Sequence, residues 1–193
     1  MRLKKVKMAI ALSLLLVGGV VLVSLWVNLR GRDRRLENAE TGGVISTGGA
    51  DQRLEKIHFV EEKHGQKIWE LEAKSLSQYQ DQNLLLLEEV TVIYYSKDGR
   101  TYLLNGNRGK VHQETKDMEL VGNVKFTSAE GYQLTTHSIS YQHSNRRVKT
   151  SDPIELEGEQ IHLTGVGMVI DLEARTFKVL GQVKTQWKGG RKG

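Results

Sequence analysis

The sequence of 193 residues contains no cysteine. The chain therefore has neither a disulfide framework nor a thiolate metal site. It also lacks the local patterns of familiar enzyme centres, namely G-x-S-x-G, S-x-x-K, H-E-x-x-H and a phosphate-binding glycine loop. We expect a protein that is not an enzyme and that carries no cofactor.

Close histidine pairs, which place two imidazoles on one ion, are absent as well. The six histidines stand singly, at His58, His64, His112, His137, His143 and His162. The acidic pairs Glu61-Glu62 and Glu88-Glu89 are adjacent, so in a strand their side chains point to opposite faces. The sequence therefore predicts no metal site and no pair of carboxylates that could share a substrate.

A basic groove for nucleic acid is also missing, although the isoelectric point is about 9.3. Residues 1–35 hold eight Lys or Arg and one acid, and residues 188–193 hold three Lys or Arg and no acid. The segment between them, residues 36–187, has a net charge of −5. Because the body of the protein is mildly acidic, we expect no nucleic-acid partner.

One long apolar run is present. Residues 8–29 carry no charge, and basic residues lie close to both ends. As a helix the run would extend roughly 33 Å, enough to cross a hydrocarbon core of ~30 Å. A cleaved signal peptide is the alternative, but its apolar region usually spans about 7 to 15 residues and ends at a small-x-small site. The sequence predicts a transmembrane helix over residues 8–29.

The rest of the chain divides by composition. Residues 1–7 are predicted to be a cytoplasmic tail, because a short basic tail usually stays there while the long C-terminal part crosses. Residues 30–52 contain charged residues and then two Thr-Gly-Gly sequences, which is typical of a flexible linker. Residues 53–187 form one predicted domain, and residues 188–193 a basic tail.

Apolar and polar residues alternate in short runs from Ile57 to Val183. A period of two predicts half-buried antiparallel strands, with polar partners such as Glu70 and Glu72 on a solvated outer face. Turn sequences such as Asp98-Gly99 separate the runs at hairpin distances. We expect ten or more strands, no helix after the anchor, and an all-β domain.

Two further patterns concern the shape of the sheet. Val121-Gly122-Asn123-Val124-Lys125 matches Leu180-Gly181-Gln182-Val183-Lys184, and units about 34 residues apart predict stacked layers in an elongated sandwich or V-shaped sheet. Glycines also recur on the apolar phase, which indicates close backbone approach or a partly vacant interior. These structural glycines are Gly122, Gly165, Gly167 and Gly181.

An open sheet has two unpaired edges that can add a strand from another protein. The expected edges are the terminal runs 57–61 and 176–183. The candidate edge residues are Ile57, Phe59, Glu61, Thr176, Lys178, Leu180 and Val183.

The order of these features resembles the LptC family, the single-span component of bacterial lipopolysaccharide export, and more distantly LptA. The resemblance rests on the basic tail, span and Gly-rich stalk, then Trp69-x-Leu71-x-Ala73, the repeated Gly/Glu-x-Val-x strands and Leu163-Thr164-Gly165-Val166-Gly167-Met168. It implies a twisted antiparallel β-jellyroll of the OstA-like kind after one transmembrane helix. The implied location is the inner membrane of a Gram-negative cell, single-pass, with the domain in the periplasm.

The function implied by the resemblance is passive. An inner-membrane ABC transporter of the LptF, LptG and LptB type would deliver lipopolysaccharide, and an LptA-like bridge protein would receive it. The N-terminal edge would face the transporter and the C-terminal edge the bridge. The implied lipid-binding interior comprises Phe59, Trp69, Leu71, Val124, Phe126, Leu134, Ile139, Tyr141, Leu163 and Val179. Membrane lipids are expected partners of the anchor.

Two other functions fit the pattern of strands. The first is a membrane-tethered β-scaffold that recruits envelope proteins through its sheet edges and has an ordinary closed core. The second is a polysaccharide binder, which would need exposed aromatic platforms. Only Trp187 is expected near the surface, which disfavours the polysaccharide binder.

Overall fold

The computed structural model describes residues 50, 52–63, 65–96 and 98–188. The predicted cytoplasmic tail (1–7) and transmembrane helix (8–29) lie outside the described residues, as do most of the linker and of the basic tail. Within the described part, no helix combines the length and apolar character that a membrane crossing requires.

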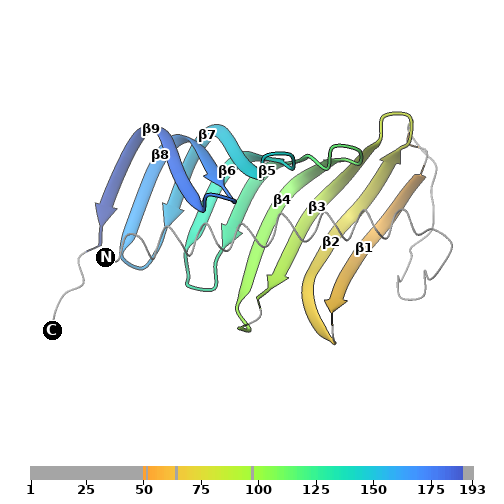
Figure 1. Cartoon of the computed structure of the whole chain (residues 1–193), viewed down its shortest axis with the longest axis horizontal. Helices are drawn as coiled ribbons and strands as arrows, with labels where there is room; N and C mark the ends of the chain where they lie inside the picture. Colours follow the sequence, from red (N-terminus) through yellow and green to blue (C-terminus); the bar gives the residue numbers. More distant parts are fainter. Residues whose placement is uncertain (1–49, 51, 64, 97, 189–193) are drawn as a thin grey trace.

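The described chain is all-β, as predicted. Nine strands lie side by side in chain order along the long axis of the molecule, from orange β1 to blue β9 (Figure 1). They are β1 (Gln52–Lys63), β2 (Gln66–Tyr79), β3 (Leu84–Tyr95), β4 (Thr101–His112), β5 (Met118–Thr127), β6 (Gln133–Gln142), β7 (Arg147–Glu157), β8 (Ile161–Asp171) and β9 (Thr176–Trp187). Each strand pairs antiparallel with the next, so the sheet is an open meander without a Greek-key crossover.

The expected count of ten or more strands is wrong for the described part of the chain. The runs around Leu134 and Ile139 belong to one strand, β6. Its pairing with β7 shifts register between Thr136 and Ser140. That irregularity moves the apolar positions from even to odd residue numbers. Because of this change of phase, the sequence pattern of one bent strand looks like that of two short strands.

Similar irregularities lie near the middle of most strands and form a bend line across the sheet. Lys56, Glu89 and Asn123 have φ between 50° and 54°, and Gln182 has φ 49°. A left-handed residue within a strand interrupts the alternation and bends the strand. Lys56, Glu89 and Asn123 follow one another at intervals of 33 and 34 residues. The predicted internal repeat is therefore a repeat of strand, bend and strand.

In strands such as β3 the bend reverses the apolar phase while it keeps the apolar side chains on one face. In β3, Leu85 and Leu87 are buried before the bend, whereas Val90 and Val92 are buried after it. The two parts of the sheet, hereafter half-sheets, thus direct their apolar faces toward a shared interior. One continuous hydrophobic cluster contains residues from both half-sheets.

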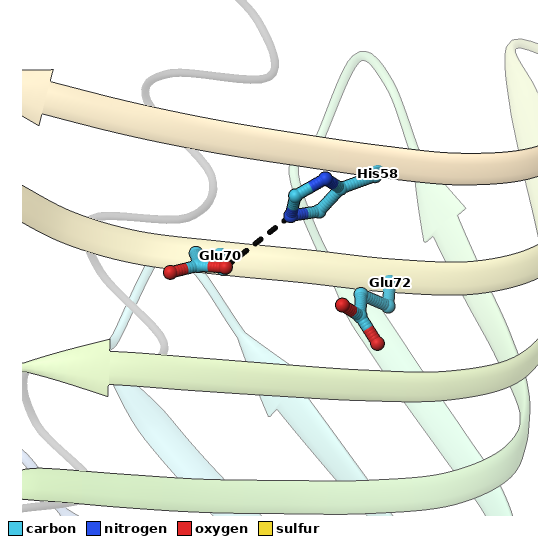
Figure 2. Close-up of side chains that lie close together, drawn as sticks. All are labelled: His58, Glu70 and Glu72. Atoms are coloured by element: carbon cyan, nitrogen blue, oxygen red, sulfur yellow. Dashed lines mark hydrogen bonds and ion pairs between the residues drawn. The ribbon is translucent and has the colours of Figure 1, made fainter. Parts of the chain in front are cut away.

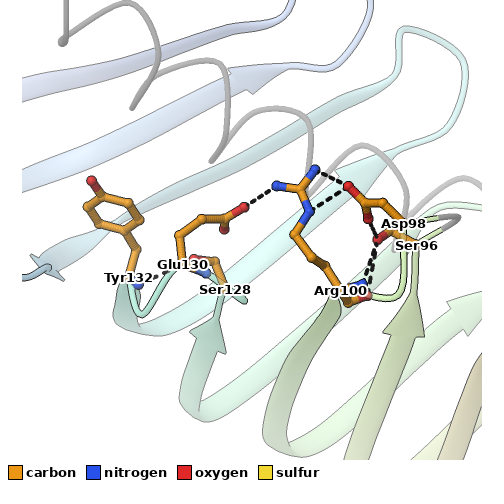
Figure 3. Close-up of polar contacts among 6 residues, drawn as sticks. All are labelled: Ser96, Asp98, Arg100, Ser128, Glu130 and Tyr132. Carbon is orange, nitrogen blue, oxygen red and sulfur yellow. Dashed lines mark hydrogen bonds and ion pairs between the residues drawn. The ribbon is translucent and has the colours of Figure 1, made fainter.

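Successive turns along each rim of the sheet contact one another. On the rim formed by the turns after β3 and β5, the Arg100 guanidinium bonds Asp98 of its own turn at 2.7 Å and Glu130 of the next at 2.5 Å (Figure 3). The serines Ser96 and Ser128 occupy equivalent places, since each hydroxyl accepts backbone N–H bonds from its own turn. The Arg100 guanidinium also holds the pKa of Asp98 well below its usual range.

On the opposite rim, formed by the turns after β2, β4, β6 and β8, backbone groups make the equivalent contacts. The N–H of Gln113 donates to the carbonyl of Asn83 at 2.8 Å, and the N–H of Leu172 donates to the carbonyl of Arg146 at 3.0 Å. Contacts between neighbouring turns therefore stiffen parts of both rims.

Candidate functional site

The ten residues predicted to line the interior all lie in or against the hydrophobic cluster. Six are buried: Trp69, Leu71, Val124, Phe126, Leu134 and Tyr141. Four are partly buried and pack against the others: Phe59, Ile139, Leu163 and Val179. The phase of the alternation placed every one of these side chains on the correct face. Whether they contact lipid is taken up below as a proposal.

Aromatic side chains form a row on the inner face. Only some of them were among the predicted interior residues. Phe59 stacks on Trp69, with ring centroids 6.5 Å apart. Further along, Tyr94 lies 6.2 Å from Tyr102, which stacks at 6.5 Å on Phe126. Burial raises the pKa of Tyr94 and of Tyr102. Both tyrosines share the phase of apolar neighbours in their strands, and that signal could have added them to the predicted interior.

Trp69 is the largest fully buried side chain, and its indole N–H has a partner inside the interior. The Nε1–H group donates to Glu61 Oε2 at 2.5 Å. Glu61 lies directly opposite Trp69 in the β1–β2 pairing, so its side chain is on the inner face. The predicted edge residue Glu61 therefore also satisfies the one polar atom of the Trp69 side chain.

The interior is closed by its own side chains in this conformation. Met168 and Ile170 are fully buried, and Phe126 and Ile154 are nearly so. Two depressions, of about 300 and 460 Å³, are lined by outer-face residues such as Glu119, Lys149, Glu155 and Lys184 together with Ile139 and Ile154 of the interior. An acyl chain could reach the cluster only if the half-sheets separated.

Of the two interpretations of the glycine phase, a partly vacant interior is wrong, whereas close approach of a neighbouring strand is confirmed at Gly165. A Cβ on Gly165 would lie 2.3 Å from Val179 Cγ1, so the side chain of the neighbouring strand already occupies that space. At Gly181 a Cβ would make only an ordinary contact, 3.8 Å from the carbonyl oxygen of Val166. Gly165 thus allows β9 to approach β8 closely.

Gly122 and Gly167 are required by backbone conformation. Their φ values are 84° and 74°, which side-chain-bearing residues rarely adopt. A Cβ on Gly122 would meet the exposed Asn107, and one on Gly167 would meet the exposed Leu180. Both glycines therefore face outward at the bend, and placing them on the apolar phase was wrong because their left-handed backbone interrupts the regular alternation there.

Both predicted edge segments lie on edge strands, β1 and β9. On β1 the candidate residues Ile57, Phe59 and Glu61 pair with the inner-facing Ala73, Leu71 and Trp69. On β9 the outward-facing candidates are Thr176, Lys178 and Leu180, which alternate with the partly buried Phe177 and Val179. The candidates thus divide between the two faces of the sheet.

The apolar inner face continues to the end of β9, where nothing in the described chain covers it. Trp187 lies opposite the buried Ile161, and Thr185 opposite Leu163, so the side chains at 183, 185 and 187 are on the inner face. Val183 is 52% exposed and Trp187 58% exposed. The C-terminal edge therefore combines free backbone groups with an uncovered strip of apolar surface.

The outer face contains a buried carboxylate where we expected a solvated one. The Glu70 side chain is only 9% exposed. Its Oε1 accepts hydrogen bonds from Lys67 Nζ and from the Tyr95 hydroxyl, each at 2.7 Å. The hydrogen bonds from Lys67 and Tyr95 lower the pKa of Glu70 to about 2. Glu72, two residues further along β2, is exposed as predicted.

The bent open meander, with one apolar face running from edge to edge, is the architecture that the resemblance implied. A family model described as lipopolysaccharide-assembly, LptC-related, matches residues 16–188. The chain belongs to the LptC family. No curated protein sequence matches it. Membership gives this LptC-family protein a role in lipopolysaccharide transport and places it in a family that is not one of enzymes.

Proposed function

We propose that this LptC-family protein shields the acyl chains of lipopolysaccharide between its two half-sheets while the lipid passes along the sheet from β1 to β9. An inner-membrane ABC transporter of the LptF, LptG and LptB type delivers the lipid at the β1 edge. An LptA-like periplasmic bridge protein receives it at the β9 edge. The protein acts passively, as a conduit.

The observation that carries this proposal is the continuity of the apolar inner face. The hydrophobic cluster includes residues from β2 to β8, and partly buried side chains of β1 and β9 pack against it. At the C-terminal edge the same face ends in the exposed Val183 and Trp187. A sheet that closed only its own core would gain nothing from large apolar side chains left uncovered at an edge.

Entry of lipid requires the half-sheets to separate, because their side chains fill the interior. Backbone pairing in the described chain joins only strands that are consecutive in sequence, so separation does not disrupt the ladders of the sheet. The inner side chains lose contacts with one another and gain contacts with acyl chains. Burying about 12 methylene groups of one acyl chain contributes a favourable free energy of about 10 kcal/mol. The hydrophobic contribution of the interior is thus largely conserved.

The proposal includes an anchor. Residues 8–29 hold the protein in the inner membrane as a single span, with the sheet in the periplasm and residues 1–7 in the cytoplasm. The family model begins at residue 16, so the second part of this apolar run belongs to the segment that the family shares.

Site-specific photocrosslinking tests the conduit. A photoreactive phenylalanine analogue placed at Phe126, which is buried on the inner face, is expected to form a covalent adduct with lipopolysaccharide in cells that are exporting it. The adduct is detected as a slower band that reacts with antibodies against both the protein and lipopolysaccharide.

Lys125 provides the matched control, because it is adjacent in β5, exposed and on the outer face. We expect no adduct from position 125. Equal labelling at 125 and 126, or labelling at 125 alone, would contradict a path through the interior.

The closed interior also favours a second function, that of a scaffold whose edges recruit envelope proteins without lipid. The scaffold predicts adducts between edge positions and proteins, and no lipid adduct at Phe126. The photocrosslinking experiment therefore separates the two functions directly.

A further inference from the structure

Three potential metal ligands meet on the outer face of β1 and β2, away from the apolar interior. His58 of β1 lies directly opposite Glu72 of β2 in the strand pairing, and Glu70 lies two residues before Glu72 on the same face. One ligand atom from each of the three side chains lies within 4.8 Å of the other two. Figure 2 shows the His58 ring beside the Glu70 carboxylate, with Glu72 on the same side of the sheet.

The spacing of these atoms suits a small divalent ion. His58 Nε2 is 3.2 Å from Glu70 Oε2. Ligands bound to tetrahedral zinc at about 2.0–2.2 Å lie roughly 3.4 Å from one another, so these two atoms are already near the required separation. Glu72 is exposed and its flexible side chain can complete a third ligand position.

Glu70 is held in place by groups that do not occupy the oxygen facing His58. Lys67 Nζ and the Tyr95 hydroxyl both donate to Oε1, whereas Oε2 points toward His58. The side chain is 9% exposed, so its orientation is fixed by packing as well. Hydrogen bonds from outer residues to the free oxygen of a ligating carboxylate are the usual support of a metal site.

We propose that His58, Glu70 and Glu72 form a binding site for Zn²⁺, with water as the remaining ligand. One imidazole and two carboxylates make up a set of three protein ligands that zinc accepts. A metal ion at this site links the edge strand β1 to β2. In the described sheet, β2 is the one strand that pairs with β1. The site is independent of the lipid path, because it uses the opposite face.

A second group, Glu155, Glu157 and His162, also brings three such atoms within 4.8 Å. It is less prepared for a metal, because neither of its carboxylates is buried as that of Glu70 is. Its two carboxylate side chains are 56% and 41% exposed, and no packing fixes their orientation. This group serves as an internal comparison for the site at His58.

Zinc titration of the full chain in detergent micelles, purified without a polyhistidine tag, tests the proposal. Isothermal titration calorimetry with Zn²⁺ alone is expected to give one site per chain, with Kd on the order of 10 μM or lower. Zn²⁺ at about 100 times Kd should raise Tm by about 5 °C or more, because only the folded chain assembles the site. Co²⁺ in place of Zn²⁺ should show the visible absorption of four-coordinate cobalt.

The variants His58→Asn and Glu72→Gln each remove one ligand from an exposed side chain and are expected to fold normally. Each should weaken Zn²⁺ binding at least tenfold and abolish the Tm shift. The controls His137→Asn, at an exposed histidine, and His162→Asn, in the comparison group, should bind as the unaltered chain does. Unaltered binding in His58→Asn and Glu72→Gln, loss of binding in His162→Asn alone, or Kd above about 100 μM would overturn the proposal.

Discussion

Replacing Gly165 by alanine is expected to lower the free energy of unfolding by about 2 kcal/mol, because the new methyl group has no space. Its Cβ would lie 2.3 Å from Val179 Cγ1 and 3.1 Å from the carbonyl oxygen of Gly181. Valine is branched at Cβ and cannot rotate freely away, so β9 must move outward. Urea unfolding of the full chain, followed by tryptophan fluorescence, measures the change.

Gly181→Ala is the matched control, since the same methyl group there makes only a 3.8 Å contact. We expect Gly181→Ala to change stability by less than about 1 kcal/mol. Adding Gly165→Ala to Val179→Ala should cost less stability than Gly165→Ala costs in the unaltered chain, because removing Cγ1 relieves the 2.3 Å contact. Equal destabilisation by Gly165→Ala and Gly181→Ala would show that close approach of Val179 is not the reason for Gly165.

Val183→Asp is expected to abolish transfer of lipopolysaccharide to the bridge protein while the domain remains folded. Val183 is 52% exposed on the inner face of the C-terminal edge strand, so an aspartate is tolerated in the isolated chain. Docking of the next β-domain would bury that carboxylate without a partner, at a cost of several kcal/mol. A loss of more than tenfold in copurified LptA-like protein is expected, together with lower lipopolysaccharide at the cell surface.

Leu180→Asp is the control for this prediction, because Leu180 lies on the same strand and is 62% exposed, but faces outward beside Gly167. It should retain most of the binding to the bridge protein. Normal binding in Val183→Asp, or equal loss in both variants, would contradict docking through a continuous inner face.

The sequence was sufficient to predict the class of fold and the face on which each interior side chain lies. Alternation with a period of two depends only on local backbone geometry, so Phe126 and Leu134 could be placed correctly without knowing their partners. The same reasoning identified both edge strands, because a meander leaves its first and last strands unpaired. The predicted turn glycine Gly99 also has the positive φ that such a turn requires.

The bend line was the part of the fold that alternation could not reveal. Left-handed residues such as Glu89 and Gln182 are not glycines, so no residue type marks them in the sequence. Glu89 changes the phase of β3 and Gly167 that of β8, whereas the irregularity that made β6 look like two strands involves no left-handed residue among those described. A regular phase argument holds only between two such residues.

The polar features of the site depended on pairing between strands, which spacing along the chain does not contain. His58 and Glu70 are twelve residues apart, yet the β1–β2 hairpin places their side chains 3.2 Å from each other. The burial of Glu70 likewise depends on Lys67 and on Tyr95 from a third strand. The closure of the interior is a property of packing between half-sheets, and periodicity alone says nothing about it.

Separation of the half-sheets by lipid can be measured with two spin labels. The chain has no cysteine, so cysteines introduced at Ala129 and Ser144 are the only positions that react with the spin label. These exposed positions lie in the turns before and after β6, on opposite rims of the bent sheet. Pulsed electron paramagnetic resonance measures the distance between the two labels on the full chain in detergent. We expect the distance distribution to become longer and broader when lipopolysaccharide is added. An unchanged distribution in a sample that has bound lipopolysaccharide would contradict an interior that opens to receive it.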